Sequence, residues 1–394
     1  MKRHPYAFIV GCVCVAIASS ANAHAQTNIP IRMLSAPDAV SPSNVGGLGG
    51  VRELSDGRVL VNESGNRRAV LFDKALANFQ IVADSSIATH NLYGKRPTGI
   101  IPYVGDTTLL IDVGARAFLV MSPSGAVTRV MSAPRQNDVA MMGSSEYGAP
   151  GFDSKGRLIY RSFALPPFKA PVAGKPYDAP VMPDSTPILR GDFNTRSADT
   201  LAWVRVAKMR ITVTPIAGGG VTMSPVVNPL ANIDDWALLP DGTIAVLRGQ
   251  DYHIDWVSTD GTRSSSPKMP FDWKRLTDEE KNAIVDSTKK ALAKIGETSI
   301  AAAVATGHGA PSGGGHGMTI MPLASNDGGP APQAAMGATS GAPLVPEVGP
   351  VSDLPDYMPP VLRAGLMKSD MQGNLWILPS TSSQSGNGLL YDVV

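Results

Sequence analysis

Short apolar segments alternate with turn residues along most of the chain. Five segments repeat one pattern, in which an Asp- or Gly-containing turn precedes a short run of mostly aliphatic or β-branched residues. This combination is the strongest local signal for a β-hairpin. The five segments are 54–61, 105–112, 153–160, 239–246 and 370–377. We therefore expect an all-β protein whose sheets consist of short strands joined by tight turns.

The first three segments recur about every 50 residues, a period typical of the four-stranded blades of a β-propeller. The later intervals are longer, and we assign the excess to insertions. A Pro-rich stretch at 166–184 is expected to form a surface loop. Thr277 and Glu280 form a capping-box pair before an amphipathic pattern, so we expect a surface helix at 278–295 that ends at Gly296. Residues 297–357 are rich in Ala, Gly, Pro and Ser, and we expect this insertion to be disordered.

Composition narrows the class of protein further. Gly and Pro, 40 and 33 of the 394 residues, disfavour a helical bundle or a coiled coil. The 34 basic and 33 acidic residues nearly balance, so we expect no nucleic-acid partner.

The N-terminus predicts export. Lys2 and Arg3 precede an apolar run at 7–20 that is too short to span a bilayer, and small-residue cleavage sites end at Ala23 and Ala25. We expect residues 1–25 to be a signal peptide and residues 27–394 to be the propeller domain, located in the periplasm or secreted, with no membrane span after signal removal. A lipoprotein cut before Cys12 or an uncleaved anchor are the alternatives. Both cysteines, Cys12 and Cys14, lie in the signal peptide, which excludes disulfides and thiol catalysis in the mature chain.

Three segments carry a resemblance to a known group. Residues 184–192, 233–242 and 251–256, with the acidic start of the helix, resemble the six-bladed NHL- and TolB-like β-propeller proteins exported by environmental bacteria. The resemblance covers most of residues 30–394 and implies a fold without a defined activity. It also implies about one further blade after residue 394. We therefore expect a C-terminally truncated sequence with its last blade incomplete, a natural five-bladed or open form being the alternative.

Propellers of the gluconolactonase type, which this chain resembles in fold, hold a divalent cation on acidic and Asn side chains just before the innermost strands. The corresponding positions here are Gly49, Gly99, Gly148, Asp234 and Gly365. One carboxylate cannot supply the six to eight oxygens that Ca²⁺ prefers. Asp234 is better explained as a strand cap or as the partner of an arginine.

The strand at 251–256 invites a second metal hypothesis, because Asp251, His253 and Asp255 alternate with apolar residues and share one side. The two aspartates lie about 13 Å apart on an extended strand, too far to bind one ion. Trp236 is better explained as a core residue than as a sugar platform.

We find no nucleotide-binding, metalloprotease or serine-hydrolase motif. The sequence favours an exported, non-catalytic propeller that binds a protein partner or small ligand at its channel mouth, without a cofactor. Asp234, Asp235 and Trp236 are the candidate ligand-binding residues. The alternatives are a metal-dependent, lactonase-like hydrolase, the one case in which bound Ca²⁺ is possible, and a structural module of a larger periplasmic assembly.

Overall fold

The computed structural model describes residues 31–394 except 91, 94–98, 144–146, 164–165, 167–174, 216–220, 307–317, 322–334, 339–345 and 385–388. The chain divides into two units, Met1–Val40 and Ser41–Val394. The predicted signal peptide lies outside the described residues. In the first unit, residues 31–40 contain no helix or strand, and Ile31, Met33 and Leu34 are exposed.

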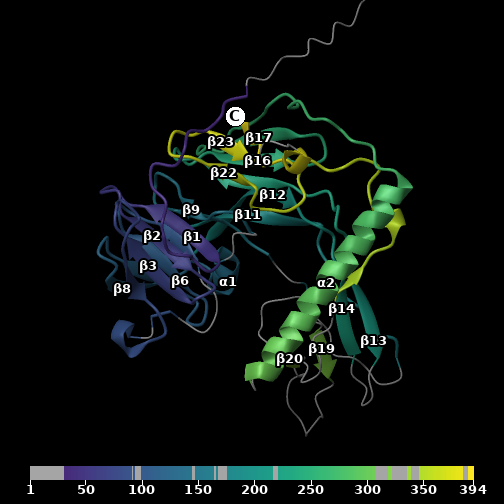
Figure 1. Cartoon of the computed structure of the whole chain (residues 1–394), viewed down its shortest axis with the longest axis horizontal. Helices are drawn as coiled ribbons and strands as arrows, with labels where there is room; N and C mark the ends of the chain where they lie inside the picture. Colours follow the sequence, from purple (N-terminus) through teal and green to yellow (C-terminus); the bar gives the residue numbers. More distant parts are fainter. Residues whose placement is uncertain are drawn as a thin grey trace, which may run out of the picture. The chain divides into compact units, whose positions relative to one another are not determined.

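Five antiparallel sheets in the described part of Ser41–Val394 share one simple order, in which each strand pairs with the next strand of the chain (Figure 1). Sheet 1 contains β1 (Leu48–Glu53), β2 (Val59–Glu63), β3 (Arg68–Phe72) and β4 (Phe79–Ala83). Sheet 2 contains β5 (Ile100–Pro102), β6 (Thr108–Asp112), β7 (Ala117–Met121) and β8 (Val127–Ser132). Sheet 3 contains β9 (Gly151–Phe152), β10 (Leu158–Arg161), β11 (Ser185–Gly191) and β12 (Ala198–Arg205). Sheet 4 contains β15 (Asp235–Leu238), β16 (Ile244–Arg248), β17 (His253–Val257) and β18 (Arg263–Ser265). Sheet 5 contains β22 (Met367–Ser369), β23 (Leu375–Ile377) and β24 (Asp392–Val393).

The first strands of successive sheets lie next to one another. β1 contacts β5, β5 contacts β9, and β15 contacts β22. Sheets 3 and 4 meet where Gly151 of β9 lies against the side chain of Leu238 in β15. The core lies between the sheets, with one buried cluster joining sheets 2 and 3, a second joining sheets 3 and 4, and a third joining sheets 4 and 5. Successive four-stranded meanders that pack face to face through inner strands are the blades of a β-propeller. The all-β propeller prediction is therefore confirmed, whereas six blades stay a prediction.

The repeated turn-and-strand segments are confirmed as one element type. They form β2, β6, β10, β16 and β23, which is the second strand of each sheet. The turn glycines Gly57, Gly156, Gly242 and Gly373 have φ values of 84°, 72°, 88° and 88°. Residues other than Gly rarely adopt a positive φ, so a Gly in the turn is a strong signal for the strand that follows it.

An additional sheet was not predicted. Two of its strands lie between sheets 3 and 4 in the sequence, and the other three lie between sheets 4 and 5. Its strands are β13 (Arg210–Pro215), β14 (Val221–Val227), β19 (Met318–Met321), β20 (Ala335–Ala338) and β21 (Glu347–Val348). β21 pairs in parallel with β14, and the other pairings are antiparallel. Strands from two separate stretches of the chain therefore form a sheet in addition to the five blade sheets.

The surface helix α2 (Asp278–Thr306) starts where the capping box predicts. The Glu280 N–H donates to Thr277 Oγ1 at 3.2 Å, and the Thr277 N–H donates to Glu280 Oε2 at 3.0 Å. The predicted end at Gly296 is wrong, because the helix continues through this glycine. One internal Gly costs only about 1 kcal/mol relative to Ala, and the alanines at 301–303 favour the helix. In the described part of the chain, no helix combines the length and apolar character that crossing a membrane requires.

The predicted disorder of residues 297–357 is wrong where the structure describes them. Residues 297–306 continue α2, residues 318–321 and 335–338 form β19 and β20, and residues 346–357 contact α2. There, Leu354 is buried in a cluster with Leu230, Leu276 and Val285 of α2. Composition averaged over the whole insertion hides these few apolar residues. Residues 307–317, 322–334 and 339–345 lie outside the described residues. The remaining short elements are α1 (Val139–Met142), η1 (Ile87–Thr89), η2 (Gln136–Asp138), η4 (Val351–Asp353) and η5 (Ser380–Gln384).

Candidate functional site

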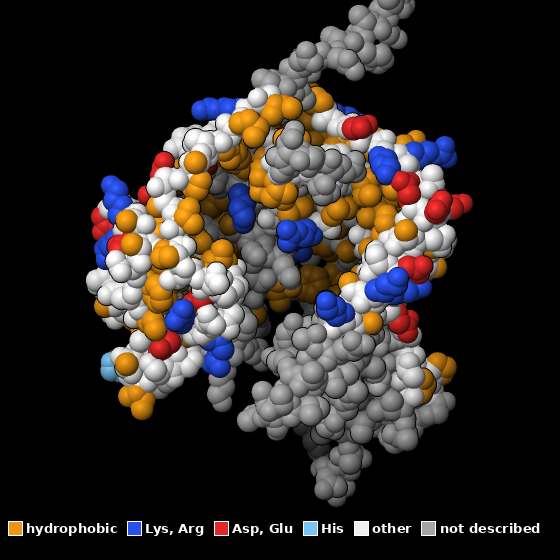
Figure 2. Space-filling model, in the orientation of Figure 1, with side chains coloured by type: hydrophobic (Ala, Val, Ile, Leu, Met, Phe, Trp, Pro, Cys, Tyr) orange, Lys and Arg blue, Asp and Glu red, His pale blue; other side chains and the backbone are white. Residues whose placement is uncertain are grey.

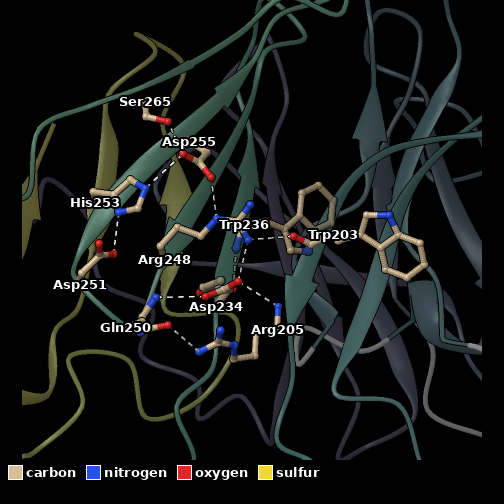
Figure 3. Close-up of polar contacts among 12 residues, drawn as sticks. Trp203, Arg205, Asp234, Trp236, Arg248, Gln250, Asp251, His253, Asp255 and Ser265 are labelled. Atoms are coloured by element: carbon tan, nitrogen blue, oxygen red, sulfur yellow. Dashed lines mark hydrogen bonds and ion pairs between the residues drawn. The ribbon is translucent and has the colours of Figure 1, made fainter.

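Asp234, the first predicted site residue, lies directly before β15 and is bonded to protein atoms on both carboxylate oxygens (Figure 3). Oδ2 accepts hydrogen bonds from the Arg205 N–H at 2.9 Å and from Arg248 Nη1 at 2.8 Å. Oδ1 accepts one from the Gly249 N–H at 3.1 Å. Pairing with an arginine, the structural explanation expected from the sequence, is therefore what the structure contains.

Asp235, the second residue, joins sheet 4 to sheet 5. Its carboxylate accepts hydrogen bonds from the backbone N–H groups of Trp236 at 2.9 Å, Gly365 at 3.0 Å and Met367 at 2.8 Å. Burial raises the pKa of Asp235, and these N–H donors oppose the rise only in part. The side chain fixes β22 against β15.

Trp236, the third residue, is 1% exposed and belongs to the core between sheets 3 and 4. Its Nε1–H donates to the carbonyl of Tyr147 at 2.8 Å. A Cβ at Gly148 would lie 2.3 Å from this nitrogen, so only glycine fits there. The structure thus brings the three predicted residues together at the start of β15, but all three form hydrogen bonds within the protein. Ligand binding by these residues stays a prediction.

A chain of charged side chains extends from Asp234 across sheet 4. Arg248 Nε donates to Asp255 Oδ2 at 2.7 Å. The His253 ring lies between two carboxylates, with Nε2 3.1 Å from Asp255 Oδ1 and Nδ1 2.6 Å from Asp251 Oδ1 (Figure 3). The predicted alternation is confirmed for His253, Ile254 and Asp255, but the strand begins at His253. Asp251 and Tyr252 lie in the preceding turn, where Tyr252 has a φ of 54°. The two aspartates are bonded to opposite nitrogens of the ring, and the described residues contain no group of three or more acidic, His or Cys side chains that could hold a metal ion.

Hydrogen bonding sets the protonation of these carboxylates. Burial acts to raise the pKa of Asp255, but hydrogen bonds from Ser265 and Arg248 outweigh it and hold the pKa below its ordinary value. Burial likewise opposes the hydrogen bond from His253 at Asp251, whose pKa is also lowered. Both groups are therefore held as carboxylates, which disfavours a role as general acid.

The arginines of sheet 4 also cover the edge of sheet 3. β12 is the outermost strand of sheet 3, and three alternate carbonyl groups along it would otherwise lack partners. The carbonyl of Leu201 accepts from Arg263, that of Trp203 from Arg248 at 2.9 Å, and that of Arg205 from the Asp234 N–H at 3.0 Å. Two arginine side chains and one backbone N–H group thereby protect an edge that would otherwise be open to another strand.

A pocket of about 150 Å³ lies between β12 and sheet 4. Its lining includes Ala202, Arg248, Asp255 and Arg263. Pockets for small ligands are typically about 300–1,000 Å³, and the charged groups of this pocket are already bonded to protein atoms. We therefore do not assign it as the main binding site.

Arg161, the last residue of β10, has no ion pair within the described part of the chain, unlike Arg248 and its carboxylate partners. The residue is 7% exposed, yet its described partners are Thr186 Oγ1, 2.9 Å from Nε, and the Tyr147 ring, whose centroid is 5.2 Å from Cζ. No carboxylate among the described residues forms an ion pair with it. Burial lowers the pKa of Arg161, and Tyr147 and Asp235 partly compensate.

Sequence reasoning missed Arg161, because it ends an ordinary turn-and-strand segment and belongs to no motif. One signal was available. Strand alternation places Arg161 on the same side as Ile159, which is 1% exposed. A charged residue is therefore expected at a position that faces the core. Figure 2 shows Lys and Arg side chains gathered around a hollow on the drawn face of Ser41–Val394.

Comparison with known proteins yields distant similarity. No protein-family model and no curated protein matches the sequence. The chain is similar to an inactive variant of virginiamycin B lyase from Staphylococcus aureus with quinupristin, at 13% identity and a TM-score of 0.31, over 59% of this chain and 58% of that chain. It therefore spans less than two thirds of that lyase.

Two further solved structures illustrate the range of similar proteins. One is a gluconolactonase from Xanthomonas campestris, at 11% identity and a TM-score of 0.25, over 56% of this chain and 75% of that chain. The other is a chain of a nidogen–laminin complex, at 11% identity and a TM-score of 0.26, over 57% and 81% of the two chains. Enzymes and a protein–protein complex both occur, and at these TM-scores neither kind of function is favoured.

Proposed function

We propose that this chain is an exported, non-catalytic β-propeller that binds a small ligand at the mouth of its channel, where β10 ends and β15 begins. One observation supports this proposal above the others. Arg161 is almost fully buried there without a carboxylate partner among the described residues, whereas the neighbouring charged groups are paired. A buried polar group without a full set of partners in the described part of the chain requires an explanation, and the explanation we propose is a bound ligand.

The absence of catalysis is inferred from how the titratable groups near this mouth are used. Asp234 and Asp235 are held by protein donors, and His253 lies between two carboxylates. A general base or nucleophile needs a free lone pair directed at substrate. No specific observation favours the lactonase-like alternative, so we do not propose it.

The test uses the full chain purified after export. We expect native mass spectrometry to detect one small molecule retained per chain after incubation with a small-molecule extract and gel filtration. The same protein with added Ca²⁺ should leave a panel of lactones unhydrolysed. Lactone turnover would contradict the non-catalytic assignment, and a chain that retains no small molecule would contradict ligand binding.

A further inference from the structure

We propose that Arg161 recognises the carboxylate group of a small, singly charged anion. This inference rests on the proposed function and specifies the chemistry of its ligand. Three observations support it: the contacts that hold the guanidinium group, the N–H groups that have no acceptor among the described residues, and the charges around the group.

The first step is pre-organisation. Arg161 Nε donates to Thr186 Oγ1 at 2.9 Å, which fixes one edge of the guanidinium group. The Tyr147 ring faces Cζ at 5.2 Å and restrains the guanidinium position through a cation–π contact. An arginine fixed on two sides loses little further freedom when it binds a ligand.

The second step concerns the unused edge. Of the five guanidinium N–H groups, the four on Nη1 and Nη2 have no acceptor among the described residues. The residue as a whole is 7% exposed, so within the described part of the chain two terminal nitrogens of a largely buried guanidinium group have no acceptor.

The third step is the charge of the ligand. A carboxylate matches two parallel N–H donors of one guanidinium and carries the single negative charge that one arginine neutralises. Asp235 lies near enough to influence the pKa of Arg161 but forms no ion pair with it. A second negative charge on the ligand would be repelled by this nearby carboxylate. A monocarboxylate therefore suits the site better than a phosphate dianion.

The experiment compares benzoate, its neutral analogue benzamide, and inorganic phosphate as probes of the exported full chain. Calorimetric titration and thermal unfolding measure binding, since a ligand of the native state raises Tm by mass action. We expect benzoate to bind and to raise Tm, benzamide to do neither, and phosphate to bind more weakly than benzoate. Equal effects of benzoate and benzamide, tighter phosphate binding, or no benzoate binding would each overturn the proposal.

Two substitutions locate the effect. Arg161→Gln should weaken benzoate binding by about 10-fold or more, because a charge-assisted hydrogen-bond pair is lost. Arg161→Lys keeps the charge but lacks the two parallel N–H donors of a guanidinium group, so it should also weaken benzoate binding. This variant provides the test if Arg161→Gln does not fold. Arg205→Gln is the control, since Arg205 is exposed and its Nη1 is bonded to Gln250, and it should bind as the wild type does. Unchanged benzoate binding in both Arg161 variants would overturn the proposal.

The two proposals fail in different ways. If a neutral molecule from the extract is retained equally by the wild type and Arg161→Gln, ligand binding stands and the carboxylate assignment fails. If nothing is retained from the extract while benzoate binding depends on Arg161, the proposed physiological function fails and the local anion chemistry stands.

Discussion

Asp235 acts at the scale of a single residue by connecting two blades. Its carboxylate binds backbone N–H groups of both β15 and the segment leading into β22, and it is 1% exposed. A buried acceptor with three donors fixes the relative position of the strands that supply them, since each unmet donor would be costly.

Asp235→Asn should lower the free energy of unfolding by about 1–3 kcal/mol, because the amide nitrogen cannot accept from the backbone N–H it would face. Urea unfolding measures the change. Asp199→Asn is the control, since the Asp199 side chain is 68% exposed, and it should change stability by less than about 0.5 kcal/mol. Equal effects of the two substitutions would show that the blade connection does not depend on Asp235.

Acid should lower the free energy of unfolding, partly through Asp251 and Asp255. Their pKa values are below the ordinary value of about 3.9, so below about pH 4 the unfolded chain binds more protons than the folded chain. Their contribution to stability is complete above that pH and is lost as the pH falls through the folded pKa values. In urea titrations between about pH 5 and pH 2, Asp255→Asn should show a shallower loss of stability than the wild type, and an unchanged slope would contradict the assignment.

The role of Asp234 could be anticipated from the sequence, whereas that of Asp235 could not. Arg248 follows Asp234 within one hairpin, so local pairing brings them together. Asp235 depends on Gly365 and Met367, which are 130 and 132 residues away. Nothing local encodes that contact, and the same holds for the stacking of Tyr147 on Arg161, which depends on a loop before β9.

At the scale of elements, the outer edge of β12 is covered by groups of the neighbouring sheet, whereas its inner edge pairs with β11. Arg248 combines a bond to the β12 edge with ion pairs to Asp234 and Asp255, at 2.8 and 2.7 Å. Arg263 supplies one bond to the same edge from an exposed position. The two arginines therefore contribute unequally to one interface.

Arg248→Met should destabilise the protein by about 2–3 kcal/mol, because two carboxylates and one carbonyl lose their charged donor. Arg263→Met, the matched control, should cost about 0.5–1.5 kcal/mol, because it removes one hydrogen bond. Urea unfolding compares them, and light scattering should show more self-association for Arg248→Met because the β12 edge is uncovered. A larger effect of the Arg263 substitution would contradict this order.

The segment at 346–358 is part of the fold. Leu354→Ala should destabilise the protein by about 2–4 kcal/mol, since Leu354 is 6% exposed and packs against Leu230 and Val285. Leu362→Ala is the control, because Leu362 is 39% exposed and should contribute much less. If the two substitutions gave the same small effect in thermal unfolding, the cluster around α2 would not contribute to stability.

Turn chemistry explains why the second strand of every sheet could be predicted and why the additional sheet could not. The glycine turns before β2, β10, β16 and β23 are local signals. β14 instead pairs with β19 and β21, about 100 or more residues away, and its sequence contains Pro225, which normally argues against an interior strand. The start of α2 is local in the same sense, whereas its extension through Gly296 depends on the alanines that follow.

For the whole molecule, the compartment is a prediction of the sequence. We expect exported protein to begin at His24 or Gln26, because the small residues Ala23 and Ala25 suit signal peptidase. Edman sequencing and intact mass measurement of protein from the periplasm or medium test this, with Ala23→Asp/Ala25→Asp as a variant that should block cleavage. A chain that begins at Met1 in the wild type, or lipid on Cys12, would contradict it.

The arginine bonds along β12 impose an order on folding. β12 precedes its partners in the chain, with 45 residues between Trp203 and Arg248 and 62 between Leu201 and Arg263. Sheet 3 can therefore form its strands early but cannot satisfy its outer carbonyl groups until sheet 4 has formed. Until then the edge is open to any unpaired strand, including one from a second molecule. Association between newly made chains should thus be most frequent after sheet 3 has formed and before sheet 4 has formed.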